Sequence, residues 1–264
     1  NIKYDKGVCK QDTLEKFYSS IYLTTNGRVE LLNKVKQYAP ANRYAMIVGC
    51  HGMGWIPSST VFKAKKSRYF GGLENGYKID IDDFAESIKA AGMKMQFILF
   101  DDCYMSCMEV AYDLKDATDY IIASTSEVMD KGMPYHRIYQ HLMATEPNYQ
   151  AVCDNFYDYY TNYSAPYGTI GVTDCRYMDE MVAMMKYINT KHTFDTDRLN
   201  NVQDLDGETF TPTIFFDFDD YVRNLCTNDN NTYEQFNAVL QRLVPYKANT
   251  NYILSGKTHG ATKV

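Results

Sequence analysis

The stretch YAMIVGCHGMGW, residues 44–55, is an apolar run that leads into a histidine set between glycines. Its first seven residues are almost entirely apolar, which predicts a β-strand buried on both faces of a sheet. Residues 95–103, MQFILFDDC, repeat the arrangement, because a second apolar run ends on two aspartates and a cysteine. In a parallel sheet, functional groups gather where the strands end, so the two stretches predict both a fold and the place of a site.

Helical and strand-like segments alternate on either side of these runs. Residues 80–92 have helical spacing, with an aspartate at the start and a glycine after the last turn. Residues 104–116 predict another helix, and residues 119–125 and 167–174 predict two further strands. Such alternation is typical of an α/β fold in which a mostly parallel sheet is sandwiched by helices.

The pattern changes after residue 192. Up to that point strands and helices alternate regularly, whereas residues 193–264 mix helical and strand-like segments. We therefore expect one α/β domain over residues 1–192 and an additional C-terminal α+β region over residues 193–264, packed on the same domain. No repeat or low-complexity segment is visible, and no linker clearly splits the chain.

Composition excludes several classes of function. The formal net charge is −6 and basic residues are scattered, which argues against a nucleic-acid partner, since phosphate binding needs a basic face. No apolar stretch is long enough for a transmembrane segment. The seven cysteines form no C-x-x-C pair, and no cysteine and histidine stand at the spacing that zinc ligands require. We expect neither a metal site nor a disulfide framework.

His51 and Cys103 are the reactive side chains that follow the two apolar runs. They meet if the two strands are neighbours in the sheet. The N-terminus of the helix predicted after Cys103, and a histidine beside it, both stabilise a thiolate. The alternatives are a buried strand-end thiol and a turn histidine. Gly52 and Gly54 count against the latter, because they let a substrate backbone approach.

The two blocks carry a resemblance. HGMGW at residues 51–55 and DDCYM at residues 101–105 resemble the His-Gly-x-Gly-Trp and Asp-x-Cys-x-Met blocks of the clostripain (C11-like) family of cysteine peptidases. Residues 109–135 are also similar to clostripain-related proteins of gut Bacteroidetes. The resemblance covers residues 40–145 and is thin beyond about residue 180. It implies a caspase-like fold, shared with gingipains and legumain, and an endopeptidase that cleaves after Arg or Lys.

The resemblance also implies a role for each matching residue. Cys103 is the nucleophile, and His51 positions or protonates the scissile amide. The backbone N–H groups of Gly52 and Cys103 form the oxyanion hole. Asp101 lies in the S1 pocket and selects a basic side chain, unless it is a strand-end carboxylate bonded to loop amides. Trp55 either lines the substrate cleft or pins its loop.

Asp102 departs from the family pattern, which more often has a small residue there. Neighbouring residues on a strand point to opposite sides, so we expect Asp101 and Asp102 to face different partners and Asp102 to be structural. The same alternation predicts that Cys50, next to His51, is a packed bystander. For Cys107 we expect core packing rather than a resolving thiol.

Residues 63–68, KAKKSR, form a basic cluster in a predicted loop. The resemblance implies activation by cleavage after a basic residue between the two blocks, which makes four residues candidate cleavage sites: Lys63, Lys65, Lys66 and Arg68. A solvated basic loop is the alternative. Residues 195–208 have the acidic spacing of a calcium loop without its glycine. The sequence requires no cofactor, although the resemblance allows calcium.

The expected partners are protein or peptide substrates with a basic residue at P1, and the expected location is secreted or anchored at the cell surface. The resemblance also implies that a first strand and helix, and any signal or lipid anchor, are missing from the chain. Two other functions stay open. One is a non-catalytic clostripain-like surface binding protein with a blocked cleft, and the other is a thiol hydrolase or transferase that acts on non-peptide amides.

Overall fold

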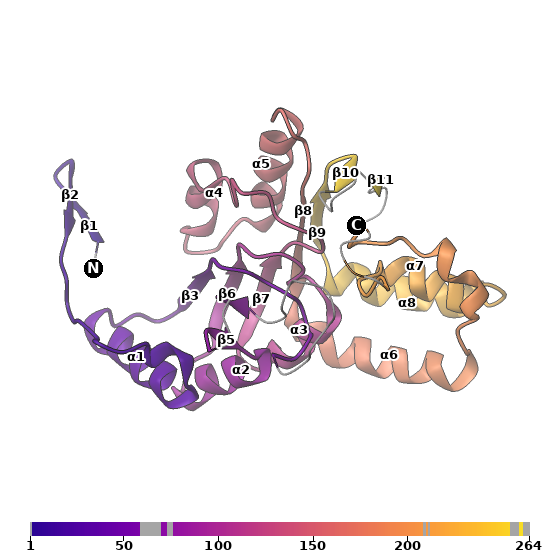
Figure 1. Ribbon diagram of the computed structural model, residues 1–264, viewed down its shortest axis with the longest axis horizontal. Helices are drawn as coiled ribbons and strands as arrows, with labels where there is room; N and C mark the ends of the chain where they lie inside the picture. The colour runs from indigo at the N-terminus through magenta and orange to yellow at the C-terminus, as the bar shows by residue number, and fades with distance from the viewer. Residues whose placement is uncertain are drawn as a thin grey trace.

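The computed structural model describes residues 2–58, 70–72, 76–207, 210, 212–253 and 259–260. Its centre is a five-stranded sheet with the order β3-β6-β7-β8-β9, and helices cover both of its faces (Figure 1). The strands are β3 (Tyr44–Val48), β6 (Met95–Phe100), β7 (Thr118–Ala123), β8 (Thr169–Asp174) and β9 (Tyr246–Asn249).

The direction of the strands confirms a mostly parallel sheet. Strands β3, β6 and β7 are parallel to one another. Strand β8 is antiparallel to β7, and β9 is antiparallel to β8. Therefore β9 runs in the same direction as β3, β6 and β7, and only β8 is reversed. The carboxyl ends of β3 and β6 lie at the same edge of the sheet, where Val48 pairs with Phe100.

Side chains of β6 alternate between two cores. Ile98 and Phe100 pack into the larger core, which also takes the buried faces of α2 (Ile81–Ala90), α3 (Met108–Leu114), α6 (Met178–Lys191) and α8 (Asn230–Leu243). Phe97 and Leu99 point to the other face, against α4 (Tyr135–Leu142) and α5 (Tyr149–Thr161). The period of two in a strand therefore distributes one apolar run over both layers.

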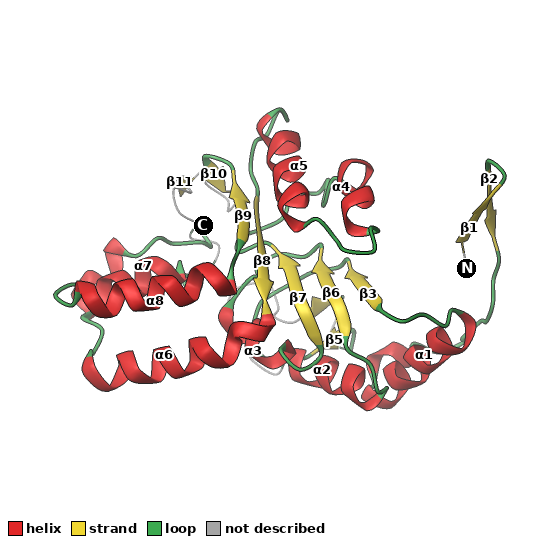
Figure 2. Cartoon of the chain, turned by 180° about the vertical axis from the view of Figure 1, so that it is seen from behind, coloured by secondary structure: helices red, strands yellow, loops and turns green. Residues whose placement is uncertain are grey.

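Helix α1, a hairpin and several short elements complete the described chain. Helix α1 (Thr25–Tyr38) packs beside α2, where the buried Arg28 donates to Ser87. The hairpin of β1 (Ile2–Asp5) and β2 (Val8–Gln11) stands apart from the sheet (Figure 2). The other short elements are β4 (Phe70–Gly71), β5 (Lys78–Ile79), β10 (Tyr252–Ile253), β11 (His259–Gly260), η1 (Ile21–Leu23), η2 (Cys175–Tyr177), η3 (Thr196–Asn201) and α7 (Phe218–Leu225).

Two expectations are wrong in detail. Strand β3 is not buried on both faces, because it is at the end of the strand order and Ile47 is 52% exposed. The helix predicted over residues 104–116 begins only at Met108. Tyr104 has a φ of 62°, in the left-handed region, so the chain turns after Cys103 before the helix starts. The thiol therefore does not sit directly at a helix N-terminus.

The C-terminal region shares the main sheet. Strand β9 adds to its edge beside β8, and α8 packs in the same core as α6. The boundary expected at residues 192 and 193 stays a prediction.

Candidate active site

The two catalytic candidates follow neighbouring parallel strands. Val48 of β3 lies opposite Phe100 of β6, and the Asp101 N–H donates to the Val48 carbonyl at 2.8 Å. His51 lies three residues after Val48, and Cys103 lies three residues after Phe100. The two strands are neighbours, which is the condition for the two residues to meet, and the segments that carry both residues leave the sheet at the same edge.

Gly52 brings the two segments into backbone contact. A Cβ at this position would lie 2.4 Å from the Cys103 carbonyl oxygen and 2.7 Å from the Asp102 Cβ. Only glycine allows so close an approach. Because Gly52 is bonded to His51, this contact places the histidine segment directly beside the cysteine.

The backbone of His51 is also held by Gly71. The His51 N–H donates to the Gly71 carbonyl at 3.2 Å, and the Gly71 N–H donates to the His51 carbonyl at 2.9 Å. The His51 residue is exposed and Cys103 is half-buried, so both are open to solvent at the end of the sheet.

The loop after β7 supports the thiol. The Val128 N–H donates to the Cys103 Sγ at 3.2 Å. The Tyr104 N–H donates to the Ser126 carbonyl at 3.1 Å, which fixes the residue after the cysteine to the same loop. An N–H group that points at sulfur favours the thiolate over the thiol.

Buried hydroxyl groups hold this loop in place. Thr169 Oγ1 on β8 lies 2.7 Å from Ser124 Oγ and 3.2 Å from Ser126 Oγ, and it accepts from the Thr125 N–H at 3.1 Å. Ser124, Ser126 and Thr169 are each no more than 1% exposed. Sequence reasoning missed this group, although the run of small hydroxyl residues after a strand was its signal.

Asp101 is held by the loop before α4. Its Oδ1 accepts from the Met133 N–H and its Oδ2 from the Tyr135 hydroxyl, both at 2.9 Å. A Cβ at Gly132 would meet the Asp101 Oδ2 at 2.7 Å, so glycine is needed beside the carboxylate. Burial, and then the charge of Asp101, raise the pKa of Tyr135. Nothing in the sequence marks Met133 or Tyr135 as a partner of Asp101.

Asp102 ties the two catalytic segments together. Its Oδ1 accepts from the Cys50 N–H and its Oδ2 from the Cys50 thiol at 3.5 Å, whereas Asp101 faces other partners, as expected. Asp102 is 1% exposed, and burial raises its pKa to about 6. The prediction that Cys50 is packed away is wrong, because this residue is exposed and is oriented by Asp102. Cys107 packs against the larger core, as expected.

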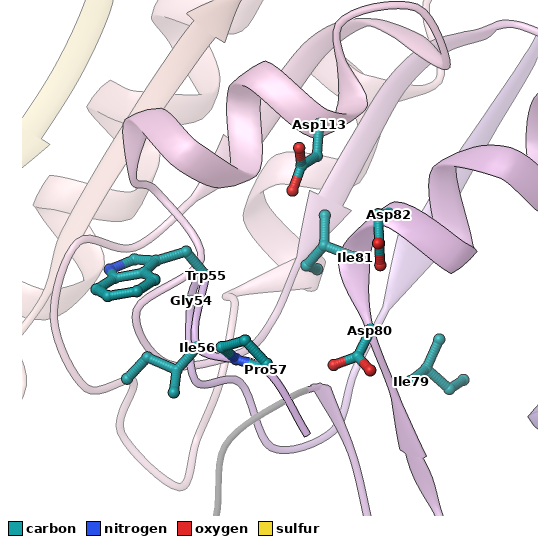
Figure 3. Close-up of a pocket in the computed structure, with 9 residues that line it drawn as sticks. All are labelled: Gly54, Trp55, Ile56, Pro57, Ile79, Asp80, Ile81, Asp82 and Asp113. Carbon is teal, nitrogen blue, oxygen red and sulfur yellow. The ribbon is translucent and has the colours of Figure 1, made fainter. Parts of the chain in front are cut away.

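Trp55 borders a cavity that is separate from the two catalytic candidates. The indole is 45% exposed and lies at one wall of a cavity of about 190 Å³ (Figure 3). Apolar and acidic side chains line the remainder, among them Ile56, Pro57, Ile81, Asp80, Asp82 and Asp113. Asp80 is engaged by the Ser58 N–H and hydroxyl, each at 2.7 Å. Neither His51 nor Cys103 lines this cavity, so the role of Trp55 at a substrate stays a prediction.

The described residues hold no cluster of metal-binding side chains. Among them, no three His, Cys, Asp or Glu side chains are arranged to hold a metal ion. The basic cluster at residues 63–68, with Lys63, Lys65, Lys66 and Arg68, lies outside the described part of the chain. In the portion that is described, no helix has the length and apolar character needed to cross a membrane.

Comparison with known proteins points to one family. The model of the clostripain family matches residues 24–242. A secreted C11 cysteine protease from Bacteroides thetaiotaomicron, "iotapain", is 46% identical over 99% of this chain and 75% of its own, with a TM-score of 0.93. A clostripain from B. thetaiotaomicron ATCC 29148, in complex with the peptide inhibitor BTN-VLTK-AOMK, is 49% identical over 74% of this chain and 86% of its own, with a TM-score of 0.71.

A third structure is more distant. An inactive zymogen C11 protease from Parabacteroides distasonis is 28% identical over 99% of this chain and 74% of its own, with a TM-score of 0.84. No curated protein matches the chain. The resemblance inferred from the two sequence blocks and the caspase-like fold are both confirmed by these similarities.

Proposed function

Since the chain belongs to the clostripain family and is a cysteine protease, we propose that it cleaves protein or peptide substrates after Arg or Lys, with Cys103 as the nucleophile and His51 as its partner. The observation that carries this proposal is the backbone contact between Gly52 and Cys103, which sets the histidine and cysteine segments side by side at the end of two parallel strands.

The chemistry follows from these positions. The Cys103 thiolate, supported by the Val128 N–H, attacks the scissile carbonyl carbon. Negative charge develops on the carbonyl oxygen, where the N–H groups of Gly52 and Cys103 stabilise it. His51 gives a proton to the leaving amine as the C–N bond breaks. Water then hydrolyses the thioester and releases the acid product together with the free cysteine.

Asp101 supplies the selection of a basic side chain. The Met133 N–H and the Tyr135 hydroxyl each use one lone pair of the carboxylate, which leaves further lone pairs for a cation. Within the described chain, no Lys or Arg forms an ion pair with Asp101, so a substrate side chain is the partner that we propose. The inhibitor bound to the B. thetaiotaomicron clostripain contains a lysine, which supports the same preference.

The proposal is tested with fluorogenic peptides that carry Arg, Lys or a neutral residue before the reporter group. The wild type should cleave the basic peptides, and Cys103→Ala should lower kcat by roughly 10⁴-fold. Asp101→Asn should lose most of the preference for basic over neutral peptides. Cys107→Ala is the matched control and should keep its activity, since Cys107 packs against the core.

Two outcomes would overturn the proposal. One is a wild type that cleaves neither basic peptide while Cys103 stays unlabelled by an electrophilic peptide with a basic side chain. The other is a Cys103→Ala variant that is as active as the Cys107→Ala control.

Activation and export are part of the proposal. The related P. distasonis protease is described as an inactive zymogen, which supports activation by cleavage after a basic residue within residues 63–68. The similar protease iotapain of B. thetaiotaomicron is described as secreted, which supports a secreted or surface-anchored location for this chain. Use of calcium stays a proposal from the family resemblance.

A further inference from the structure

One aromatic ring from the C-terminal region touches both catalytic segments. Phe215 stacks on Tyr104, with ring centroids 4.5 Å apart and an interplanar angle of 9°. A Cβ at Gly54 would lie 2.8 Å from the Phe215 Cε1, so the same ring is pressed against the turn that follows the histidine. Tyr104 is the residue after Cys103, and Gly54 lies three residues after His51. Phe215 and Tyr104 are 4% and 2% exposed.

Both contacted residues have left-handed backbone conformations, which are ordinary for glycine and rare for tyrosine. Tyr104 has a φ of 62° and Gly54 a φ of 58°. A bulky non-glycine residue rarely adopts the left-handed region and stays there only when its surroundings hold it. The stacked Phe215 ring is one support for Tyr104, and the hydrogen bond from the Tyr104 N–H to the Ser126 carbonyl is another.

Phe215 is itself held firmly. Asp206 is 0% exposed, and its Oδ2 accepts from the Ile214 N–H at 2.7 Å and from the Phe215 N–H at 3.2 Å. The Leu205 N–H donates to the Phe215 carbonyl at 3.0 Å. The Asp204 Oδ1 accepts from the Asp206 and Gly207 N–H groups, each at 2.8 Å. The buried Asp206 carboxylate and the turn at Asp204 therefore fix the ring that contacts the catalytic segments.

We propose that Phe215 is a positioning residue for catalysis, and that it holds the turn after His51 and the residue after Cys103 in fixed register. The inference rests on the proposed roles of His51 and Cys103. Through Phe215, the C-terminal region then supports the active site. This region contributes none of the residues proposed for the dyad, the oxyanion hole or the S1 pocket. Gly52 brings the two segments into contact, and Phe215 prevents them from sliding past each other.

The test compares Phe215→Leu with Phe236→Leu in the complete chain. Leucine keeps an apolar side chain at residue 215 but removes the stacked ring. Phe236 of α8 is the matched control, because it is also fully buried and packs on Phe218 and Tyr233 rather than on the catalytic segments. Four quantities are measured: the melting temperature, kcat per titrated active site, KM, and the rate at which iodoacetamide alkylates Cys103 across a pH series.

We expect both variants to melt at lower temperature than the wild type. Only Phe215→Leu should lower kcat, by about 10-fold or more, with less than about a 3-fold change in KM, since small displacements of catalytic groups act on the chemical step. Its alkylation rate should also fall, or its pH profile shift, while Phe236→Leu follows the wild type.

Equal kcat and equal alkylation profiles for the two variants would overturn the inference. A wild type that cleaves no basic peptide would instead count against the proposed function. In that case the alkylation rates still decide whether Phe215 controls the environment of the thiol, so the two failures are distinguishable.

Discussion

Gly52 makes the closest contact between the two catalytic segments. A Cβ there would lie 2.4 Å from the Cys103 carbonyl oxygen and 2.9 Å from the Met105 Cγ, closer than packed atoms allow, so the backbone must move. We expect Gly52→Ala to destabilise the fold by about 1–3 kcal/mol and to lower kcat by about 10²-fold, because the dyad is displaced. Thermal unfolding and cleavage of a basic fluorogenic peptide measure the two effects.

Gly49→Ala is the control for this substitution. Its Cβ would have the Asp101 Cβ as its nearest neighbour, at 4.0 Å, which is an ordinary contact. Wild-type activity and melting for Gly49→Ala, together with a loss for Gly52→Ala, would attribute the effect to the contact with Cys103. If Gly52→Ala behaves like the wild type, the two backbones do not meet in this way.

Single residues differ in how visible they are in the sequence. His51 and Cys103 stand where apolar runs end, and the change of residue type marks them without a structure. The partners of Asp101 were invisible, because Met133 and Tyr135 lie 32 and 34 residues away along the chain. They reach Asp101 only because the loop after β7 passes the end of the neighbouring strand β6.

Among the secondary-structure elements, the loop between β7 and α4 depends on one side chain of β8. Thr169→Val removes the hydroxyl and keeps the shape of the side chain. The Thr125 N–H and the Ser124 and Ser126 hydroxyls then each lose one hydrogen-bond partner. We expect a loss of about 1–3 kcal/mol of stability. We also expect a lower kcat, because the loop then holds the Val128 N–H less firmly against Cys103. Denaturant unfolding and steady-state kinetics check these expectations.

Thr169→Ser and Thr173→Val are the controls. Serine restores the hydroxyl and should recover most of kcat. Thr173 lies on the same strand at 3% exposure and forms no side-chain hydrogen bond within the described chain, so valine there should change little. A Thr169→Val variant with the stability and kcat of Thr173→Val would show that the hydroxyl network does not hold the loop.

The elements themselves were largely predictable, and the errors have identifiable causes. Apolar runs gave β3, β6, β7 and β8, but a run does not encode strand order, so the edge position of β3 and the reversal of β8 came only from the structure. The late start of α3 follows from the left-handed Tyr104, and a tyrosine carries no sequence signal for that conformation.

For the molecule as a whole, two buried carboxyl groups make stability depend on pH. Burial raises the pKa of Asp102 and of Asp217 to about 6 each, above the value of roughly 4 in an unfolded chain. Between these values the folded protein binds more protons than the unfolded one. The stabilising contribution of each group to the free energy of unfolding is therefore fully present below about pH 4. It is lost as the pH rises to about 6.

Asp217→Asn tests this pH dependence of stability without removing the N-cap of α7. The Asp217 Oδ1 accepts from the Asp220 N–H at 2.8 Å, and the asparagine oxygen can accept the same hydrogen bond. The variant should gain stability relative to the wild type as the pH rises from 4 to 7, by up to roughly 3 kcal/mol for a shift of about two pKa units. Chemical denaturation at several pH values measures the difference.

Asp229 provides a control of opposite sign. Asp229 is the N-cap of α8, and hydrogen bonds from the Thr232 side chain and N–H lower its pKa. Its contribution to the free energy of unfolding is therefore present above the unfolded pKa and is lost in acid. Asp229→Asn should therefore lose stability relative to the wild type as the pH rises from 3 to 7, while Asp217→Asn gains it. If both differences change with pH in the same direction, burial does not raise the pKa of Asp217, and the ionised carboxylate is stabilised by its contacts at the start of α7.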